Sequence, residues 1–169
     1  MANQTPFRKA LVTGAAGELG TELCRNLSRM GTAIVALDID EAGLDTLYAS
    51  LGDGGSIDTF QADLCDHEVL EVRLKEIADA HPDIDVLFAN AGIDSPQRAE
   101  SLDWRIAKRH FDINTTANYV LLSVFLPRFI ERGSGHVVAT ISLGALAGMP
   151  YEHAYNGSKS AMHLSLIHI

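Results

Sequence analysis

The sequence predicts a doubly wound α/β domain, in which helices cover both faces of a parallel sheet. Short apolar segments alternate along the chain with longer segments whose apolar residues recur at helical spacing. The short segments are almost continuously apolar, which is typical of parallel strands that are buried on both faces. A glycine-rich turn at 13–20 also separates the first apolar segment from the first helical one, as in doubly wound sheets.

The first half of the chain contains two strand–helix pairs. Ala10–Val12 is a short apolar strand, and the helix expected at 18–30 has apolar residues on one face and Gly31 as a C-terminal stop. A second strand at 33–37 ends at Asp38, and a helix is expected at 41–51. The glycine cluster at 52–55 predicts a turn after this helix.

The second half repeats the alternation. Strands are expected at 57–62, 86–89 and 136–141, a helix at 66–80 before Pro82, and mostly helical structure in two pieces across 99–130. A last helix contains Tyr155 and Lys159. Since no repeat, low-complexity tract or linker interrupts the pattern, we expect residues 1–169 to form a single domain.

Composition narrows the class of protein. A chain of 169 residues with 47% apolar and 21% charged residues is ordinary for one globular domain with a sizeable core. The formal net charge of −9 argues against nucleic acid or an anionic membrane as a partner, because both favour a basic surface. It leaves room for an anionic ligand, since backbone dipoles bind phosphate even in an acidic protein.

Targeting and redox features point to the cytoplasm. The N-terminal residues are polar and lack the apolar core of a signal peptide. The longest apolar run, 119–130, is interrupted by polar residues, so we expect no transmembrane span. Cys24 and Cys65 form neither a disulfide framework nor a metal-binding pattern, and a reduced protein is the default.

The turn at 13–20, TGAAGELG, is a candidate phosphate-binding turn. Gly14, Gly17 and Gly20 would allow the backbone to turn tightly and to approach a pyrophosphate, which would rest on the N-terminus of the following helix. Such turns also serve simply as connections, and the position between a strand and a helix favours nucleotide binding.

Asp38 is a candidate ligand for an adenosine ribose, because an acidic residue at the end of the second strand accepts hydrogen bonds from the ribose hydroxyls. The same carboxylate would repel a 2′-phosphate, and the following Ile39 and Asp40 offer no positive charge. The sequence therefore favours NAD over NADP. The alternative, a cap for the helix that follows, fits Asp40 better.

Two further segments follow strands. Asp63 is either the cap of the next helix or an acceptor for an adenine amino group. Asn90 is placed to cross-link neighbouring strands, while the small Ala91 and Gly92 leave space for a flat ring. Each segment taken alone also reads as a simple loop.

Tyr155 and Lys159 are candidates for proton transfer. They stand four positions apart, so on a helix they share a face. A phenol with a reference pKa near ~10 is a poor base at neutral pH, and a neighbouring ammonium favours its ionised form. Taken alone, the pair is equally explained as a chance pattern on a solvated helix. The other motifs of the chain distinguish this explanation from a catalytic pair.

Taken together and in order, TGAAGELG, Asp38, the ADL at 62–64, the NAG at 90–92, Asn114, Ser142 and the YNGSK at 155–159 resemble the short-chain dehydrogenase/reductase family, in its compact, classical branch. The resemblance runs from about Arg8 to about Met162. It implies a Rossmann fold and an NAD(H)-dependent oxidoreductase that transfers hydride between nicotinamide and an alcohol or ketone.

The resemblance also implies roles for individual residues. Tyr155 would be the general acid/base, Lys159 would hold the nicotinamide ribose and assist the tyrosine, and Ser142 would hydrogen-bond the reacting oxygen. Asn114 would anchor a water molecule that links Lys159 to solvent, or would simply be a satisfied polar residue in a long helix. The implied cofactor-binding residues are Gly14, Gly17, Leu19, Gly20, Asp38, Asp63, Leu64, Asn90, Ala91, Gly92, Tyr155 and Lys159; no metal is implied.

Two departures leave alternatives open. Gly17 falls one position early and Glu18 takes the place of the middle glycine, a spacing more typical of the extended branch, which includes sugar-nucleotide epimerases. Compact members run to roughly 250 residues, so we expect a C-terminally truncated chain that lacks the last strands and whose fifth strand is an exposed edge. Such a chain is alternatively a catalytically incompetent nucleotide-binding fragment.

The resemblance further suggests a homo-oligomer at full length, through the long helices around Asn114 and Tyr155, with the apolar run at 119–129 as a candidate interface. The substrate itself is not predicted. Candidate residues for its pocket follow the fourth and fifth expected strands: Asp94, Ser95, Leu143, Gly144, Met149 and His153.

Overall fold

A five-stranded parallel sheet forms the centre of the molecule in a computed structural model that describes residues 7–51 and 55–166. The predicted turn at 52–55 falls mainly on residues 52–54, outside the described residues. The strands are β1 (Lys9–Thr13), β2 (Ala33–Asp38), β3 (Ile57–Gln61), β4 (Val86–Ala89) and β5 (His136–Ala139), in the order β3-β2-β1-β4-β5. The predicted parallel α/β fold is confirmed.

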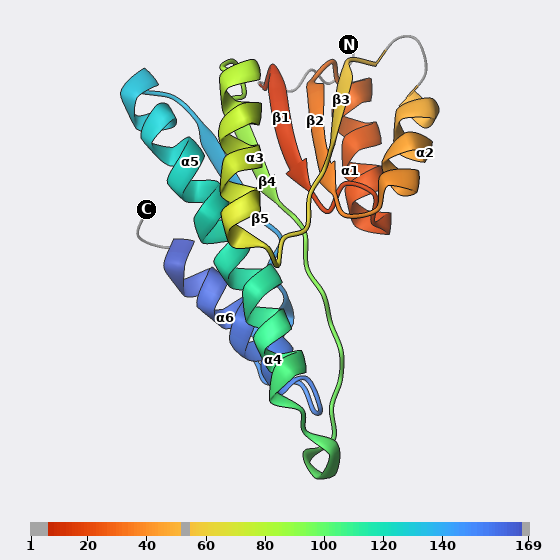
Figure 1. The fold of residues 1–169 in the computed structure, drawn as a ribbon, viewed down its shortest axis with the longest axis vertical. Coiled ribbons are helices and arrows are strands. Elements are labelled where there is room, and N and C mark those ends of the chain that lie inside the picture. The colour runs from red at the N-terminus through yellow and green to blue at the C-terminus, as the bar shows by residue number, and fades with distance from the viewer. Residues whose placement is uncertain (1–6, 52–54, 167–169) are drawn as a thin grey trace.

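Helices cover both faces of this sheet (Figure 1). They are α1 (Glu18–Arg29), α2 (Glu41–Leu51), α3 (His67–Ala80), α4 (Trp104–Phe111), α5 (Ala117–Arg132) and α6 (His153–Leu166), with short 3-10 turns at Ala99–Ser101 and Leu143–Ala145. Within the described residues, no helix combines the length and the apolar content that crossing a membrane requires.

The core has two parts because successive side chains of a strand point to opposite faces of the sheet. Leu11, Val35 and Leu87 face α3 and α5, and they pack there with residues such as Leu74 and Phe125. Their neighbours along the strands, Ala10, Val12, Ile34 and Ala36, face α1 and α2. The strands are therefore buried on both sides, which explains their continuous apolar sequence.

The region at 99–130, predicted to be helical in two pieces, consists of α4 and α5 joined by a π-helical turn at Asp112–Thr116. Such a turn inserts one extra residue into a helix and is frequent at functional sites. Here it contains Asn114, which is completely buried.

The strand predicted at 136–141 is shorter than expected, since β5 ends at Ala139. Thr140 still donates its backbone N–H to Ala89 O, but its side chain and carbonyl bond to Asn90 and Lys159 instead of continuing the sheet. In the described part of the chain β5 pairs only with β4, and Val138 is 42% exposed. The predicted exposed edge is therefore present.

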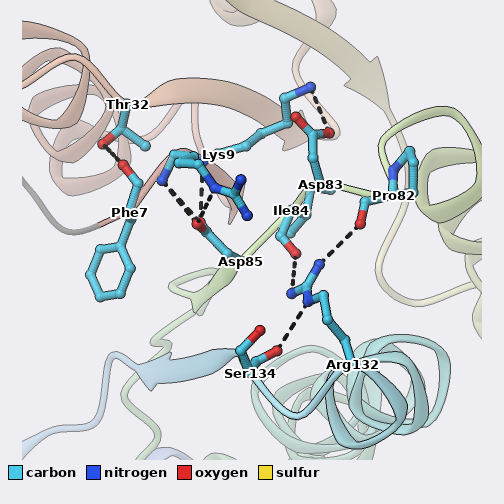
Figure 2. A network of polar contacts seen from close by, with 10 residues as sticks. Phe7, Lys9, Thr32, Pro82, Asp83, Ile84, Asp85, Arg132 and Ser134 are labelled. Carbon is cyan, nitrogen blue, oxygen red and sulfur yellow. Dashed lines mark hydrogen bonds and ion pairs between the residues drawn. The ribbon is translucent and has the colours of Figure 1, made fainter.

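A polar network closes the end of the sheet at which β1 and β4 begin (Figure 2). The Asp85 carboxylate accepts hydrogen bonds from the backbone N–H of Arg8 (3.0 Å) and of Lys9 (3.1 Å). The guanidinium of Arg132, at the end of α5, donates to the carbonyl oxygens of Ile84 (2.8 Å) and Pro82 (3.0 Å). These contacts fix the start of β1 and β4 and tie α5 to the sheet.

We expect Asp85→Ala to lower the free energy of unfolding by about 2 kcal/mol, because two backbone N–H groups lose a charged acceptor. The matched control is Asp83→Ala, two positions earlier. The Asp83 carboxylate forms an ion pair with the Lys9 ammonium at 2.9 Å and its side chain is 53% exposed, so its loss is expected to cost less than about 1 kcal/mol. Urea unfolding of both variants measures the difference, and equal losses would contradict the role given to Asp85.

Candidate functional site

A cleft of about 540 Å³ opens at the carboxyl ends of the strands. The connection from β1 leads to β2 on one side, and β4 lies on the other side of β1, so the cleft lies where strand order reverses and doubly wound folds bind their ligands. Every residue predicted to bind cofactor lines it: Gly14, Gly17, Leu19, Gly20, Asp38, Asp63, Leu64, Asn90, Ala91, Gly92, Tyr155 and Lys159.

The glycine-rich turn is packed too tightly for side chains at two positions. Gly14 has φ +64°, and a Cβ there would lie 2.8 Å from the Cα of Ala91. A Cβ on Gly20 would overlap the carbonyl oxygen of Gly14. Gly17, which precedes α1, provides no side-chain cap, so the first N–H groups of α1 remain available to an anion.

Asp38 connects the end of β2 to the glycine-rich turn. Its carboxylate accepts hydrogen bonds from Ala16 N (2.9 Å) and Asp40 N (3.0 Å). The carboxylate of Asp40 instead accepts from Gly43 N (3.1 Å) and caps the N-terminus of α2. The prediction that Asp40 caps the helix is confirmed, and Asp38 keeps free lone pairs at the cleft, because each carboxylate oxygen accepts more than one hydrogen bond.

One of the two interpretations of Asp63 is wrong. The carboxylate that caps α3 belongs to Asp66, which accepts from Val69 N at 3.2 Å. Asp63 lies too far from the helix start at His67 and accepts from Cys65 N (2.8 Å) in a local turn. Its side chain therefore lines the cleft beside Leu64 instead of belonging to the helix.

Asn90 cross-links three strands, as predicted. Its Nδ2 donates to Thr13 O (3.1 Å) at the end of β1, and its Oδ1 accepts from the Thr140 hydroxyl (3.0 Å) after β5. The hydroxyl of Thr13 in turn accepts from the backbone N–H groups of Asn90 and Ala91. Thr13 and Thr140 were not singled out in the sequence, because only the pairing of the strands brings them to Asn90.

Tyr155 and Lys159 lie together on α6 at one side of the cleft. The Lys159 side chain is buried, with 5% of the residue exposed; its Nζ donates to Thr140 O at 2.8 Å and lies 5.9 Å from the centre of the Tyr155 ring. Burial lowers the pKa of Lys159 from its ordinary value. A Cβ on Gly92 would lie 2.9 Å from this Nζ, so glycine leaves the space that the ammonium occupies.

Asn114 lies behind the cleft and does not line it. Its Oδ1 accepts from Ile93 N (2.8 Å), and its Nδ2 donates to Ile93 O (3.0 Å) and to the Ser158 hydroxyl (3.0 Å). The side chain thus joins the segment after β4 to α6, one residue before Lys159. A Cβ on Gly92 would lie 3.3 Å from its Oδ1, so Asn114 and Lys159 approach the same glycine.

Ser142, like Asn114, does not line the cleft. Its hydroxyl accepts from Gly144 N (3.1 Å) and caps the turn at Leu143–Ala145.

Acidic groups outnumber basic ones around the cleft. Among the described residues, Arg109 is the only basic residue besides Lys159 that lines the cleft. Arg109 was not predicted from the sequence as a site residue, although it lies on α4, the helix that leads to Asn114. The carboxylates are those of Glu18, Asp38, Asp40, Asp63 and Asp94. The cleft therefore favours ligands with little negative charge outside the α1 N-terminus.

This arrangement defines a class: doubly wound α/β proteins with a glycine-rich turn after β1, an acid after β2 and a tyrosine–lysine pair in the cleft. Comparison with known proteins identifies the family within that class. The sequence profile described as "short chain dehydrogenase" matches residues 8–166, and the chain belongs to this family.

Curated relatives are dehydrogenases and reductases. The chain is 35% identical over 159 residues to 1-deoxy-11-beta-hydroxypentalenate dehydrogenase of Streptomyces exfoliatus, which covers 91% of this chain and 58% of that protein. It is 28% identical to secoisolariciresinol dehydrogenase of Forsythia intermedia, over 96% of this chain and 59% of that protein. The chain thus spans a little over half the length of these relatives.

Solved structures share the fold. A NAD⁺-bound xylitol dehydrogenase has a TM-score of 0.88 and 27% identity, covering 95% of this chain and 64% of that one. A metagenomic short-chain oxidoreductase in complex with NADP has a TM-score of 0.89 and 25% identity, covering 95% and 73%. Both forms of the nicotinamide cofactor thus occur among the structural neighbours.

Proposed function

We propose that the protein is an NAD(H)-dependent oxidoreductase that interconverts an alcohol and a ketone, with Tyr155 as general acid/base. The observation that carries this proposal is the position of Tyr155 and Lys159 in the same cleft as the glycine-rich turn. A proton-transfer group and a surface for a dinucleotide are thereby joined in one site.

The cleft fits a nicotinamide dinucleotide. The glycine-rich turn and the N-terminus of α1 would hold the pyrophosphate, because both line the cleft and the first N–H groups of the helix are uncapped. Asp38 would accept from the adenosine ribose hydroxyls, and Asp63 from the adenine amino group. When bound, the nicotinamide supplies the group that accepts or donates hydride.

The remaining residues would act on protons and orientation. Tyr155 exchanges a proton with the substrate oxygen, and the buried Lys159 ammonium hydrogen-bonds the nicotinamide ribose and favours the ionised phenol. Ser142 donates to the reacting oxygen, since its hydroxyl accepts from Gly144 N and its own proton has no partner in the described residues. Asn114 anchors the water that links Lys159 to solvent, a role supported by the approach of both residues to Gly92.

We propose NAD as the preferred cofactor. The support is electrostatic: Asp38 and Asp40, beside the proposed ribose site, line the cleft with carboxylates, and its only basic lining residues in the described chain are Arg109 and Lys159. An added phosphate would therefore meet repulsion without a basic partner.

The Glu18 carboxylate lies in the first turn of α1 and lines the cleft where the pyrophosphate would rest. We expect Glu18→Gln to tighten NADH binding by about three- to tenfold at low salt, since like charges in water-exposed sites repel by about 1 kcal/mol, and we expect the gain to shrink as salt rises. Fluorescence titration with NADH at several salt concentrations measures it. Glu22→Gln, one turn further along and paired with Arg25, is the matched control; equal effects of the two variants would contradict the prediction.

The direct test of the proposed function uses the isolated chain and the protein as it occurs in its natural source, here called the natural protein. The isolated chain is titrated with NADH while nicotinamide fluorescence is followed, and the natural protein is assayed with NAD⁺ and a panel of secondary alcohols. Binding together with alcohol-dependent NADH formation supports the proposal. Absence of NADH binding to both proteins would overturn it.

A second candidate function is nucleotide binding without catalysis. One observation favours it: Ser142, the residue proposed to bind the reacting oxygen, does not line the cleft. NADH binding by the isolated chain without turnover, alongside turnover by the natural protein, would assign this role to the chain.

We further propose a single cytoplasmic domain that self-associates at full length. Both cysteines are free, which suits a reducing compartment. The run at 119–129 is mostly core, since Leu121, Val124, Phe125 and Phe129 are buried, so an interface would depend on exposed residues of α5 such as Tyr119 and Ile130. Light scattering of the natural protein distinguishes a monomer from an oligomer.

A further inference from the structure

The segment after β4 is extended but has no partner strand in the described residues. Residues 90–98 contain no helix or strand, and Asn90 to Asp94 line the cleft. An extended backbone of this kind presents its N–H groups alternately to two sides, and those facing the protein require acceptors.

Alternate residues of this segment donate their backbone N–H to a ladder of separate acceptors. Ala91 N donates to the Thr13 hydroxyl (3.1 Å) and Ile93 N to Asn114 Oδ1 (2.8 Å). Ser95 N donates to His110 Nε2 (3.1 Å), and Gln97 N donates to Tyr151 O (2.7 Å). The first three acceptors are side chains, so side chains replace the missing strand.

His110 is completely buried, and both of its ring nitrogens have partners. Nδ1 lies 2.8 Å from Ile106 O, which can only accept, and Nε2 faces the Ser95 N–H, which can only donate. The imidazole is therefore neutral, with its proton on Nδ1. The ring lies four residues before Asn114, so the two side chains leave the same helical run toward Ser95 and Ile93.

We propose that His110 is a positioning residue for the substrate side of the cleft: as a neutral Nδ1–H imidazole, it holds Ser95 against α4. Thr13 and Asn90 hold the start of the segment, Asn114 holds Ile93, and the carbonyl oxygen of Tyr151 accepts from Gln97 N. His110 thus fixes the backbone between Ile93 and Gln97. The assignment to substrate rests on the proposed function, whereas the hydrogen bond itself does not.

Two measurements on the chain test the hydrogen bond. Nitrogen-15 NMR of the histidine ring is expected to show Nδ1 protonated and Nε2 as the acceptor; a proton on Nε2 would overturn the proposal. In His110→Phe, amide hydrogen exchange at Ser95 is expected to accelerate by about tenfold or more, because the loss of this acceptor opens the segment locally. In His110→Gln, whose side-chain oxygen can accept, slow exchange is expected to return.

Cys24→Ala is the control for general destabilisation, since Cys24 is buried in the core on the other face of the sheet. An equal acceleration at Ser95 in Cys24→Ala and His110→Phe would overturn the proposal. If His110→Phe fails to fold, the NMR measurement and His110→Gln still decide whether His110 accepts a hydrogen bond from Ser95 N.

The role in the reaction is tested by a difference between KM values in the natural protein. His110→Phe is expected to raise KM for the alcohol by about tenfold and KM for NAD⁺ by less than about threefold, with recovery in His110→Gln. Equal changes in both KM values would overturn the substrate-side assignment. If the wild-type protein binds no NADH, the proposed function fails, and the NMR and exchange results still decide whether His110 holds Ser95.

Discussion

Tyr155→Phe is expected to lower kcat for alcohol oxidation by about 10²–10⁴-fold, the usual contribution of a positioned general acid/base. The phenylalanine ring keeps the shape of the side chain and its place beside the Lys159 ammonium, 5.9 Å from the ring centre. The phenol hydroxyl makes no hydrogen bond within the described residues, so its removal leaves folding intact. Turnover is measured in the natural protein, and NADH affinity is expected to stay within about threefold of wild type.

The matched control is Tyr48→Phe, which removes a hydroxyl from an exposed tyrosine on α2 outside the cleft. It is expected to leave kcat and NADH binding unchanged. Retention of wild-type turnover in Tyr155→Phe would refute the general acid/base role. Loss of NADH binding in step with turnover would instead assign Tyr155 to cofactor binding.

Lys159→Met is expected to reduce turnover by about 10²-fold or more while leaving the protein at least as stable as wild type at neutral pH. The ammonium is buried, and its one hydrogen bond in the described residues goes to Thr140 O. A buried charge without a carboxylate partner is costly, and methionine fills a similar volume without that cost. The Lys159 ammonium is thus expected to support turnover while lowering the free energy of unfolding.

The pH dependence of stability provides a second measure of this cost. Burial lowers the pKa of Lys159 in the folded state from 10.5, the value expected when it is unfolded. Between these two values the unfolded chain binds more protons than the folded chain, so the free energy of unfolding rises with pH. Below the lowered pKa the cost of the buried charge is fully present.

The comparison of wild type with Lys159→Met isolates this contribution, because other groups titrate equally in both proteins. Urea unfolding is expected to show the stability of wild type gaining on that of the variant as pH rises toward 10.5. A variant that is less stable than wild type at neutral pH would show that the lysine stabilises the fold, contrary to this expectation. NADH titration of the same variant separates loss of binding from loss of proton transfer.

Much of the fold was predictable, because local patterns carry the information. Alternation of short apolar runs with helical periodicity is a property of neighbouring residues, and it placed all five strands within a few positions of their observed limits. The position of Asp38 at the end of β2, and of Asp40 two residues later, also follows from the chain itself. The cleft could be anticipated because parallel strands bring their carboxyl ends to one edge.

The remaining features depend on contacts between residues that are distant in sequence. No local pattern shows that Thr140 accepts from Lys159, or that the Thr140 hydroxyl donates to Asn90. The side chains of Thr13, Asn114 and His110 also could not be predicted as hydrogen-bond acceptors for residues 91–95. They meet this segment only once the sheet and the π-helical turn have formed.

The sequence by itself therefore determined the fold class, the family resemblance and the predicted cofactor-binding residues that line the cleft. Only the tertiary structure decided which polar groups pair with one another and which side chain holds which backbone segment. The physical reason is that periodicity records whether a residue faces the core or solvent, whereas a hydrogen bond requires a partner within about 3 Å in a favourable direction. That distance is set by the packing of the whole domain.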